Sequence, residues 1–61
     1  MWLAVDKDGR ELIFEDKPVR YKEERFVDTG GDVWLVPNGT IKRLLNYPLS
    51  WDNEAEEIKD Y

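Results

Sequence analysis

The 61-residue sequence contains no cysteine and no histidine. Without cysteine, the chain has no disulfide to stabilise a small fold and no thiolate ligand for a metal ion. Without histidine, it lacks the base of the usual Ser–His and Cys–His nucleophilic systems, and the common zinc ligand sets are excluded. Asp, Glu, Lys, Arg and Tyr are left for acid–base chemistry, in a chain too short for a deep pocket. We therefore expect a protein that is not an enzyme, with no catalytic, cofactor-binding or metal-ligating residues and no cofactor.

Long hydrophobic runs and clustered basic residues are also missing. The apolar start of the chain meets Asp6 before a signal-peptide core could form. No run approaches the ~20 apolar residues that span a bilayer. Nine Lys and Arg stand against 14 Asp and Glu, a net charge of −5. Since phosphate binding needs clustered basic side chains, the sequence predicts a cytoplasmic protein without a membrane or nucleic-acid partner.

The chain does contain enough apolar material for one small core. Its hydrophobic fraction is 41% and it has three Trp, three Tyr and two Phe, which is more bulky side chains than a disordered chain of this length holds. A chain this short forms one domain at most. We expect residues 1–61 to form a single small domain, with residues 52–61 as a candidate acidic tail.

Two short apolar runs near the N-terminus predict a β-hairpin. Residues 2–5 and 11–15 are both rich in large apolar side chains, and Asp8-Gly9 lies between them. An Asp-Gly pair between two such runs is the strongest short-range hairpin signal. Pro18 cannot donate to a sheet ladder, so the second strand should end before it.

The next segment, residues 19–27, is more polar. Its apolar residues alternate only in part, which favours a third strand at an exposed edge. A helix is the competing interpretation, because residues 22–25 are all good helix formers. The Gly-rich residues 28–32 predict a flexible turn, so this strand and the following one should form a second hairpin.

Residues 33–45 are predicted to be the centre of the fold. Val33 to Val36 are four consecutive apolar residues, long enough for a strand buried on both faces. We expect Trp34 to be a core residue, since a tiny domain relies on its largest side chains. A helix on one face of the sheet would leave the other face uncovered, and that face is a candidate working surface.

A short amphipathic helix is predicted over residues 40–45. Ile41, Leu44 and Leu45 are three and four positions apart, which places them on one helical stripe facing the sheet. Asn38 or Thr40 is a suitable N-cap, and Asn46 followed by Pro48 can end the helix. Alternatively, Asn38-Gly39 is a hairpin turn and residues 40–45 form a fifth strand.

The C-terminal segment is acidic. The last sixteen residues carry five Asp or Glu and one Lys, and hence most of the net charge. Residues 54–58 fit either a final strand or a helical turn. An acidic end can mimic nucleic acid in a basic groove of another protein, although such a run more often keeps a small protein soluble.

Three sequence blocks resemble a group of very short hypothetical proteins from gut bacteria and their phages. The blocks are Leu3-Ala4-Val5-Asp6, Pro37-Asn38-Gly39-Thr40-Ile41 and Leu49-Ser50-Trp51-Asp52-Asn53-Glu54. That group carries no established function, so the resemblance assigns no role to any residue. It implies a phage or mobile-element context, which favours binding over catalysis.

Together these patterns predict an α+β fold, a small antiparallel sheet of four or five strands with one short helix. A small SH3-like β-barrel is the alternative. The predicted function is a non-enzymatic module that binds a protein partner. The alternatives are a subunit completed by homo-oligomerisation and an acidic nucleic-acid mimic. The candidate partner-binding residues are aromatic or acidic: Trp2, Trp51, Tyr21, Tyr47, Glu54, Glu56 and Glu57.

Overall fold

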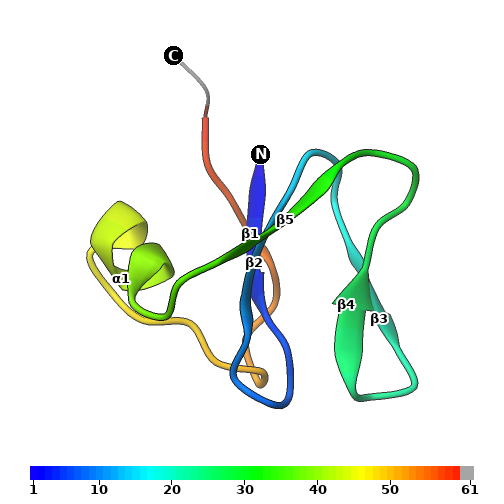
Figure 1. The fold of residues 1–61 in the computed structure, drawn as a ribbon, viewed down its shortest axis with the longest axis horizontal. Coiled ribbons are helices and arrows are strands. Elements are labelled where there is room, and N and C mark those ends of the chain that lie inside the picture. Colours follow the sequence, from blue (N-terminus) through cyan, green and yellow to red (C-terminus); the bar gives the residue numbers. More distant parts are fainter. Residues whose placement is uncertain (60–61) are drawn as a thin grey trace.

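The computed structural model describes residues 1–59 and consists of strands and one helix (Figure 1). In chain order the elements are β1 (Trp2–Val5), β2 (Glu11–Phe14), β3 (Val19–Tyr21), β4 (Arg25–Val27), β5 (Val33–Val36), α1 (Thr40–Leu45) and β6 (Glu56–Glu57).

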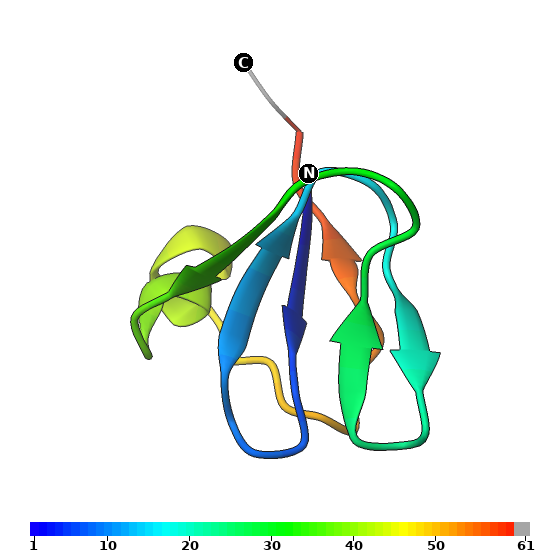
Figure 2. The same cartoon turned by 45° about the vertical axis from the view of Figure 1, so that its right-hand side comes forward.

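The predicted α+β class with one short helix is confirmed. The main sheet has four antiparallel strands in the order β5-β2-β1-β6, and a second sheet contains only β3 and β4. The N-terminal strand β1 therefore lies inside the main sheet, with β2 on one side of it and β6 on the other (Figure 2).

The β1–β2 hairpin forms as predicted, with Val5 paired to Glu11 and Trp2 paired to Phe14. The Gly9 N–H donates to the Asp6 carbonyl at 2.9 Å, which closes the turn. Gly9 has φ +92°, a left-handed conformation that an L side chain adopts only with strain. β2 ends at Phe14, ahead of Pro18 as expected.

Apolar side chains cover both faces of the main sheet. On one face, Leu3 and Val5 pack with Ile41 of α1, joined by four half-buried residues, Ile13, Leu45, Leu49 and Ile58. On the other face, Ala4 and Phe14 pack with Phe26 of β4, joined by Trp2, Leu12, Trp51 and Ala55. In Figure 2 the main sheet lies between α1 on the left and the β3–β4 hairpin on the right. The expectation of an uncovered sheet face is therefore wrong, because β4 and the Trp51 segment fill it.

Residues 19–27 do not form one strand. They form the two strands β3 and β4, joined by a tight turn in which the Glu24 N–H donates to the Tyr21 carbonyl at 3.1 Å. Lys22 and Glu23 both have positive φ, 53° and 54°. A turn with two positive φ values usually contains Asn or Gly, so these residues carry no turn signal. The predicted pairing of this segment with residues 33–36 is also wrong, because β5 pairs with β2.

β5 lies at the edge of the main sheet, and its side chains are not buried on both faces. Trp34 is 41% exposed and Leu35 is 65% exposed. The prediction that Trp34 is a core residue is therefore wrong. The covering layers do not extend over this edge, because α1 and the β3–β4 hairpin pack over the inner strands β1 and β2.

The helix has the predicted bounds, but its contacts differ from expectation. Ile41 is 1% exposed and packs on the sheet, whereas Leu44 is 49% exposed and does not belong to the predicted buried stripe. Gly39 occupies the N-cap position with no side-chain cap of its own. Asn46, in a left-handed conformation, ends the helix and donates its N–H to the Lys42 carbonyl at 2.8 Å.

The C-terminal segment is part of the sheet as far as it is described. β6 pairs with β1, Glu57 opposite Trp2 and Glu56 opposite Leu3. The Ile58 N–H donates to the Met1 carbonyl at 2.7 Å. Of the strand and the helical turn that the sequence allows for this segment, the structure has the strand; residues 60–61 of the candidate tail lie outside the described part of the chain.

Candidate functional site

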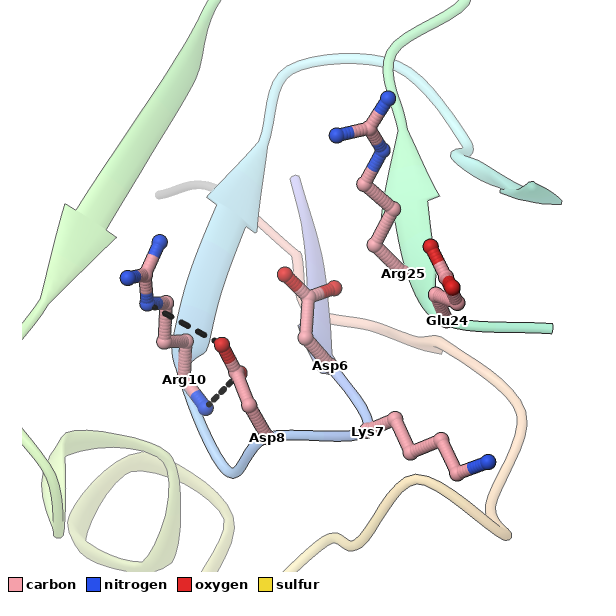
Figure 3. Close-up of a pocket in the computed structure, with 6 residues that line it drawn as sticks. All are labelled: Asp6, Lys7, Asp8, Arg10, Glu24 and Arg25. Atoms are coloured by element: carbon pink, nitrogen blue, oxygen red, sulfur yellow. Dashed lines mark hydrogen bonds and ion pairs between the residues drawn. The ribbon is translucent and has the colours of Figure 1, made fainter. Parts of the chain in front are cut away.

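A polar cavity of about 400 Å³ lies where the β1–β2 turn approaches the β3–β4 turn (Figure 3). Its lining consists of three carboxylates and three cations: Asp6, Lys7, Asp8, Arg10, Glu24 and Arg25. The formal charges cancel, so the cavity has no strong preference for an ion of either sign.

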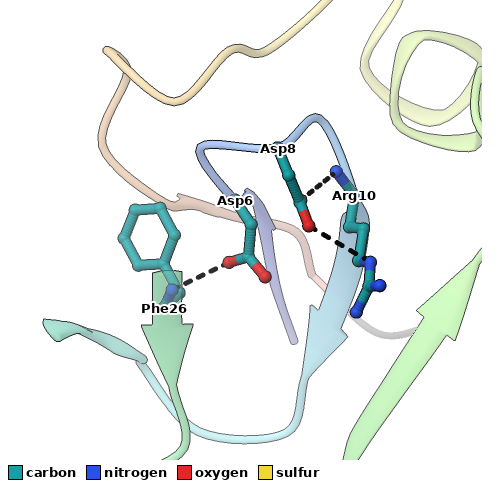
Figure 4. A network of polar contacts seen from close by, with 4 residues as sticks. All are labelled: Asp6, Asp8, Arg10 and Phe26. Carbon is teal, nitrogen blue, oxygen red and sulfur yellow. Dashed lines mark hydrogen bonds and ion pairs between the residues drawn. The ribbon is translucent and has the colours of Figure 1, made fainter. Parts of the chain in front are cut away.

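Asp6 joins the two sheets at this cavity. Its Oδ1 accepts the Phe26 N–H at 2.8 Å (Figure 4), and the neighbouring Lys7 N–H donates to the Glu24 carbonyl at 3.1 Å. Burial raises the pKa of the Asp6 carboxyl above its ordinary value of 3.8, and the Phe26 hydrogen bond opposes that rise. The two bonds connect the residues just after β1 to β4 and to the turn before it.

Two of the three carboxylates that line the cavity are engaged by other groups of the chain. Asp6 and Asp8 are neighbouring carboxylates, as in an acid–base pair. However, Asp6 is bound to the backbone of β4, and Asp8 pairs with the exposed Arg10 at 3.2 Å. Among residues 1–59 no group of three potential ligands is placed to hold a metal ion. The Asp6 carboxylate therefore joins the β1–β2 turn to β4, whereas the Asp8–Arg10 pair lies within the β1–β2 turn.

The two tryptophans of the predicted binding set belong to the core beneath the β3–β4 hairpin. Trp51 packs edge-to-face on Phe26, with ring centroids 5.4 Å apart. The guanidinium of Arg20 lies 4.2 Å from the Trp51 ring and donates to the Asn53 carbonyl at 2.9 Å. Trp2 is half-buried at the rim of the same cluster, with the Lys17 ammonium 5.4 Å from its ring.

The two tyrosines of that set are exposed but lie beside different partners. Tyr21, at the end of β3, has Lys22 and Arg25 over its ring at 5.3 and 5.1 Å. Tyr47 follows α1, and its pKa is raised above 10.0 by desolvation and by the nearby Glu56 carboxylate. The structure therefore does not bring the predicted aromatic residues together as one groove.

The predicted acidic residues do not form a single surface either. Glu56 pairs with Leu3 and Glu57 pairs with Trp2. Since adjacent residues of a strand point to opposite faces, these two carboxylates lie on opposite faces of the sheet. Glu54 is exposed in the segment before β6.

Three exposed large apolar side chains are consecutive on β5, whereas the other four, Val19, Tyr21, Leu44 and Tyr47, lie elsewhere on the described chain. Val33, Trp34 and Leu35 are 39%, 41% and 65% exposed. Trp34 pairs with Ile13 and so lies on the face that carries α1, while Val33 and Leu35 pair with Phe14 and Leu12 on the other face. This edge strand contains no charge and no proline, the features with which natural edges usually prevent pairing.

The backbone of the β5 edge is arranged to accept a further strand. The Glu15 N–H donates to the Asp32 carbonyl at 2.9 Å, which makes these two residues a hydrogen-bonded pair. Because such pairs alternate along an antiparallel ladder, the backbone groups of Trp34 and Val36 face β2, and the N–H and C=O groups of Val33 and Leu35 point outward. No other residue in 1–59 hydrogen-bonds to these outward groups.

The sequence contained a signal for this edge that the interpretation of residues 33–36 missed. A continuous apolar run is typical of a strand buried on both faces. However, a chain of 61 residues buries only about 60% of the surface that its unfolded form exposes. One apolar run in so small a sheet is therefore expected to remain incompletely covered.

No helix within residues 1–59 has the length and apolar character required to cross a membrane. Comparisons of the chain with protein-family models, with curated proteins and with solved structures find no match.

Proposed function

We propose that this chain is a non-enzymatic protein-binding module whose binding site is the β5 edge. One observation carries the proposal: β5 combines three exposed apolar side chains with outward-pointing backbone groups on two of its four residues. This edge, rather than an uncovered sheet face or the acidic end, is the surface with the properties of a binding site.

Addition of a strand is the binding mode that suits such an edge. In this mode, main-chain hydrogen bonds supply affinity, and side chains on alternate positions supply specificity. The outward groups of Val33 and Leu35 offer two donors and two acceptors. Trp34 on one face and Leu35 on the other give an arriving strand apolar contacts on both of its sides.

The surrounding charges support a protein partner over nucleic acid. The chain has a net charge of −5, and β5 itself carries no basic side chain for phosphate contacts. An acidic mimic receives no support, since Glu56 and Glu57 lie on opposite faces. We also propose that the protein is cytoplasmic and that it originates from a phage or mobile element.

Photo-crosslinking from the edge tests this function even when the identity of the partner is unknown. A photoreactive phenylalanine analogue at position 35 should give crosslinked protein products in source cells. The matched control replaces Val19, which is 50% exposed on β3, and should give none. Equal yields of product from the two positions, or no product from position 35, would remove the β5 edge as the binding site.

A further inference from the structure

The β5 edge also indicates which strand it binds, an inference that rests on the function proposed above. We infer that the occupant is the β5 edge of a second copy of this chain, paired antiparallel about a two-fold axis at Trp34. The two main sheets then join into one continuous sheet.

The hydrogen-bonding pattern of β5 is self-complementary in this register. With Trp34 opposite Trp34 of the second copy, Val33 of each copy lies opposite Leu35 of the other. These are the two residues whose N–H and C=O groups point outward, so each Val33–Leu35 pair exchanges both of its backbone bonds. A shift that moves the axis off Trp34 leaves outward groups without partners within the four-residue strand.

Side chains on both faces match in the same register. The two Trp34 side chains meet at a non-hydrogen-bonded position, where side chains are closest and aromatic pairs are favourable. On the other face, Val33 meets Leu35 of the second copy. Three exposed apolar side chains of each copy are thereby covered.

β5 itself contains no charged residue, and Asp32 is the charged residue next to it in the chain. Asp32 lies just before β5, and its N–H donates to Oε1 of Glu15 at 3.3 Å. In the antiparallel pair, this acidic end lies beside Val36 of the other copy, where the chain leads into α1. Asp32 therefore lies opposite an uncharged residue of the second copy rather than opposite its own counterpart.

Sedimentation equilibrium and disulfide trapping of the purified full chain test the inference. The wild type, 7.3 kDa, should approach twice that mass as its concentration rises. Leu35→Pro removes one outward N–H without touching the ladder to β2, so it should raise the dimer dissociation constant about tenfold or more. Val19→Lys, an exposed apolar position on β3, should leave the constant unchanged.

Single-cysteine variants test the register, because the chain has no cysteine of its own. Trp34→Cys should form an intermolecular disulfide on mild oxidation, since non-hydrogen-bonded partners lie about 4.5 Å apart at Cα. Leu35→Cys should form no such disulfide. In the proposed register the Cα atoms at position 35 of the two copies are about 8 to 9 Å apart, which is too far for a disulfide.

The outcomes separate this inference from the function on which it rests. A wild type that remains monomeric at high concentration, or equal disulfide yields from positions 34 and 35, would overturn the inferred dimer. If position 35 then still crosslinks to a different protein, the proposed binding function stands. If position 35 crosslinks to nothing, both fail.

Discussion

Glu11 is the residue that fixes the start of α1, although it lies 28 to 30 positions earlier in the chain. Its Oε2 accepts the Gly39 N–H at 2.7 Å and its Oε1 accepts the Ile41 N–H at 2.9 Å. Orphan N–H groups at a helix start are normally satisfied by a local Ser, Thr, Asp or Asn. Here the side-chain cap comes from β2, so one residue joins the sheet to the helix.

Glu11→Ala should therefore destabilise the fold by about 1–2 kcal/mol, the usual cost of losing a cap. Chemical denaturation of the variant and the wild type measures the difference. Glu54→Ala is the matched control, because Glu54 is exposed; the stability of this variant should stay within about 0.5 kcal/mol of the wild type. Equal stability of Glu11→Ala and wild type would contradict the tertiary cap.

Asp6 makes stability depend on pH in a direction set by its burial. Its pKa is raised above 3.8 in the folded protein, so the folded state holds the proton more readily than the unfolded state. The stabilisation that comes from this difference is present at pH 3.8 and below and is lost as the pH rises through the folded pKa.

Asp6→Asn should remove this dependence while its amide oxygen still accepts the Phe26 N–H. The stability of the variant relative to the wild type should increase as the pH is raised from about 4 to about 7. Denaturant midpoints at each pH measure this difference. Asp6→Ala, which leaves the Phe26 N–H without this partner, should cost about 1–3 kcal/mol at both pH values. If the wild type instead becomes more stable relative to Asp6→Asn as the pH rises, the folded Asp6 carboxyl has a lowered pKa.

At the scale of elements, the β3–β4 turn is built from residues that do not favour its conformation. Lys22 and Glu23 hold φ values of 53° and 54°, where an L side chain costs roughly 1–2 kcal/mol relative to glycine. Asn-Gly is the preferred pair for the two central residues of a turn in which both have positive φ. The double substitution Lys22→Asn, Glu23→Gly should raise the melting temperature by about 5 °C, equivalent to roughly 1 kcal/mol in a domain of this size.

Glu24→Gly is the control for that turn. Glu24 is the last residue of the turn and has no positive φ, so glycine there should lower the melting temperature through its larger loss of backbone entropy. If both variants melt below the wild type, the turn does not have two left-handed residues.

At the scale of the whole molecule, the C-terminal segment closes both layers of the core. Ile58 packs beside α1 and Ala55 packs beneath the β3–β4 hairpin. Arg20 connects the segment to β3 through its hydrogen bond to the Asn53 carbonyl at 2.9 Å. A solvated tail would make none of these contacts.

Deletion of residues 54–61 should therefore abolish a cooperative melt. It removes the β6 ladder and the core side chains of Ala55 and Ile58 from a domain whose total stability is expected near the low end of about 5–15 kcal/mol. Far-ultraviolet circular dichroism on heating measures the effect. Glu54→Gln combined with Glu57→Gln removes charge but keeps the strand and Ile58, and it should melt close to the wild type. If the deletion and the double Gln variant lose the same amount of stability, the segment stabilises the fold through its charge rather than through strand pairing.

The sequence by itself determined the elements whose signals are local. Asp8-Gly9 between two apolar runs specifies the β1–β2 hairpin, because the turn and both of its strands are adjacent in the chain. The spacing of Ile41 and Leu45, with Asn46 after them, specifies α1 for the same reason. The absence of cysteine and histidine likewise needs no structure to restrict the chemistry of the chain.

Tertiary structure alone decided which apolar residues are buried and which surface is available for binding. Trp34 and Phe26 are both large and apolar, yet Phe26 lies over the centre of the main sheet and Trp34 lies on its edge. That difference depends on strand order, which brings β5 beside β2 and places β4 over the face of the main sheet. Glu11 caps a helix far along the chain for the same reason. Local patterns specify elements through neighbouring residues, whereas burial depends on contacts between segments that are distant in sequence.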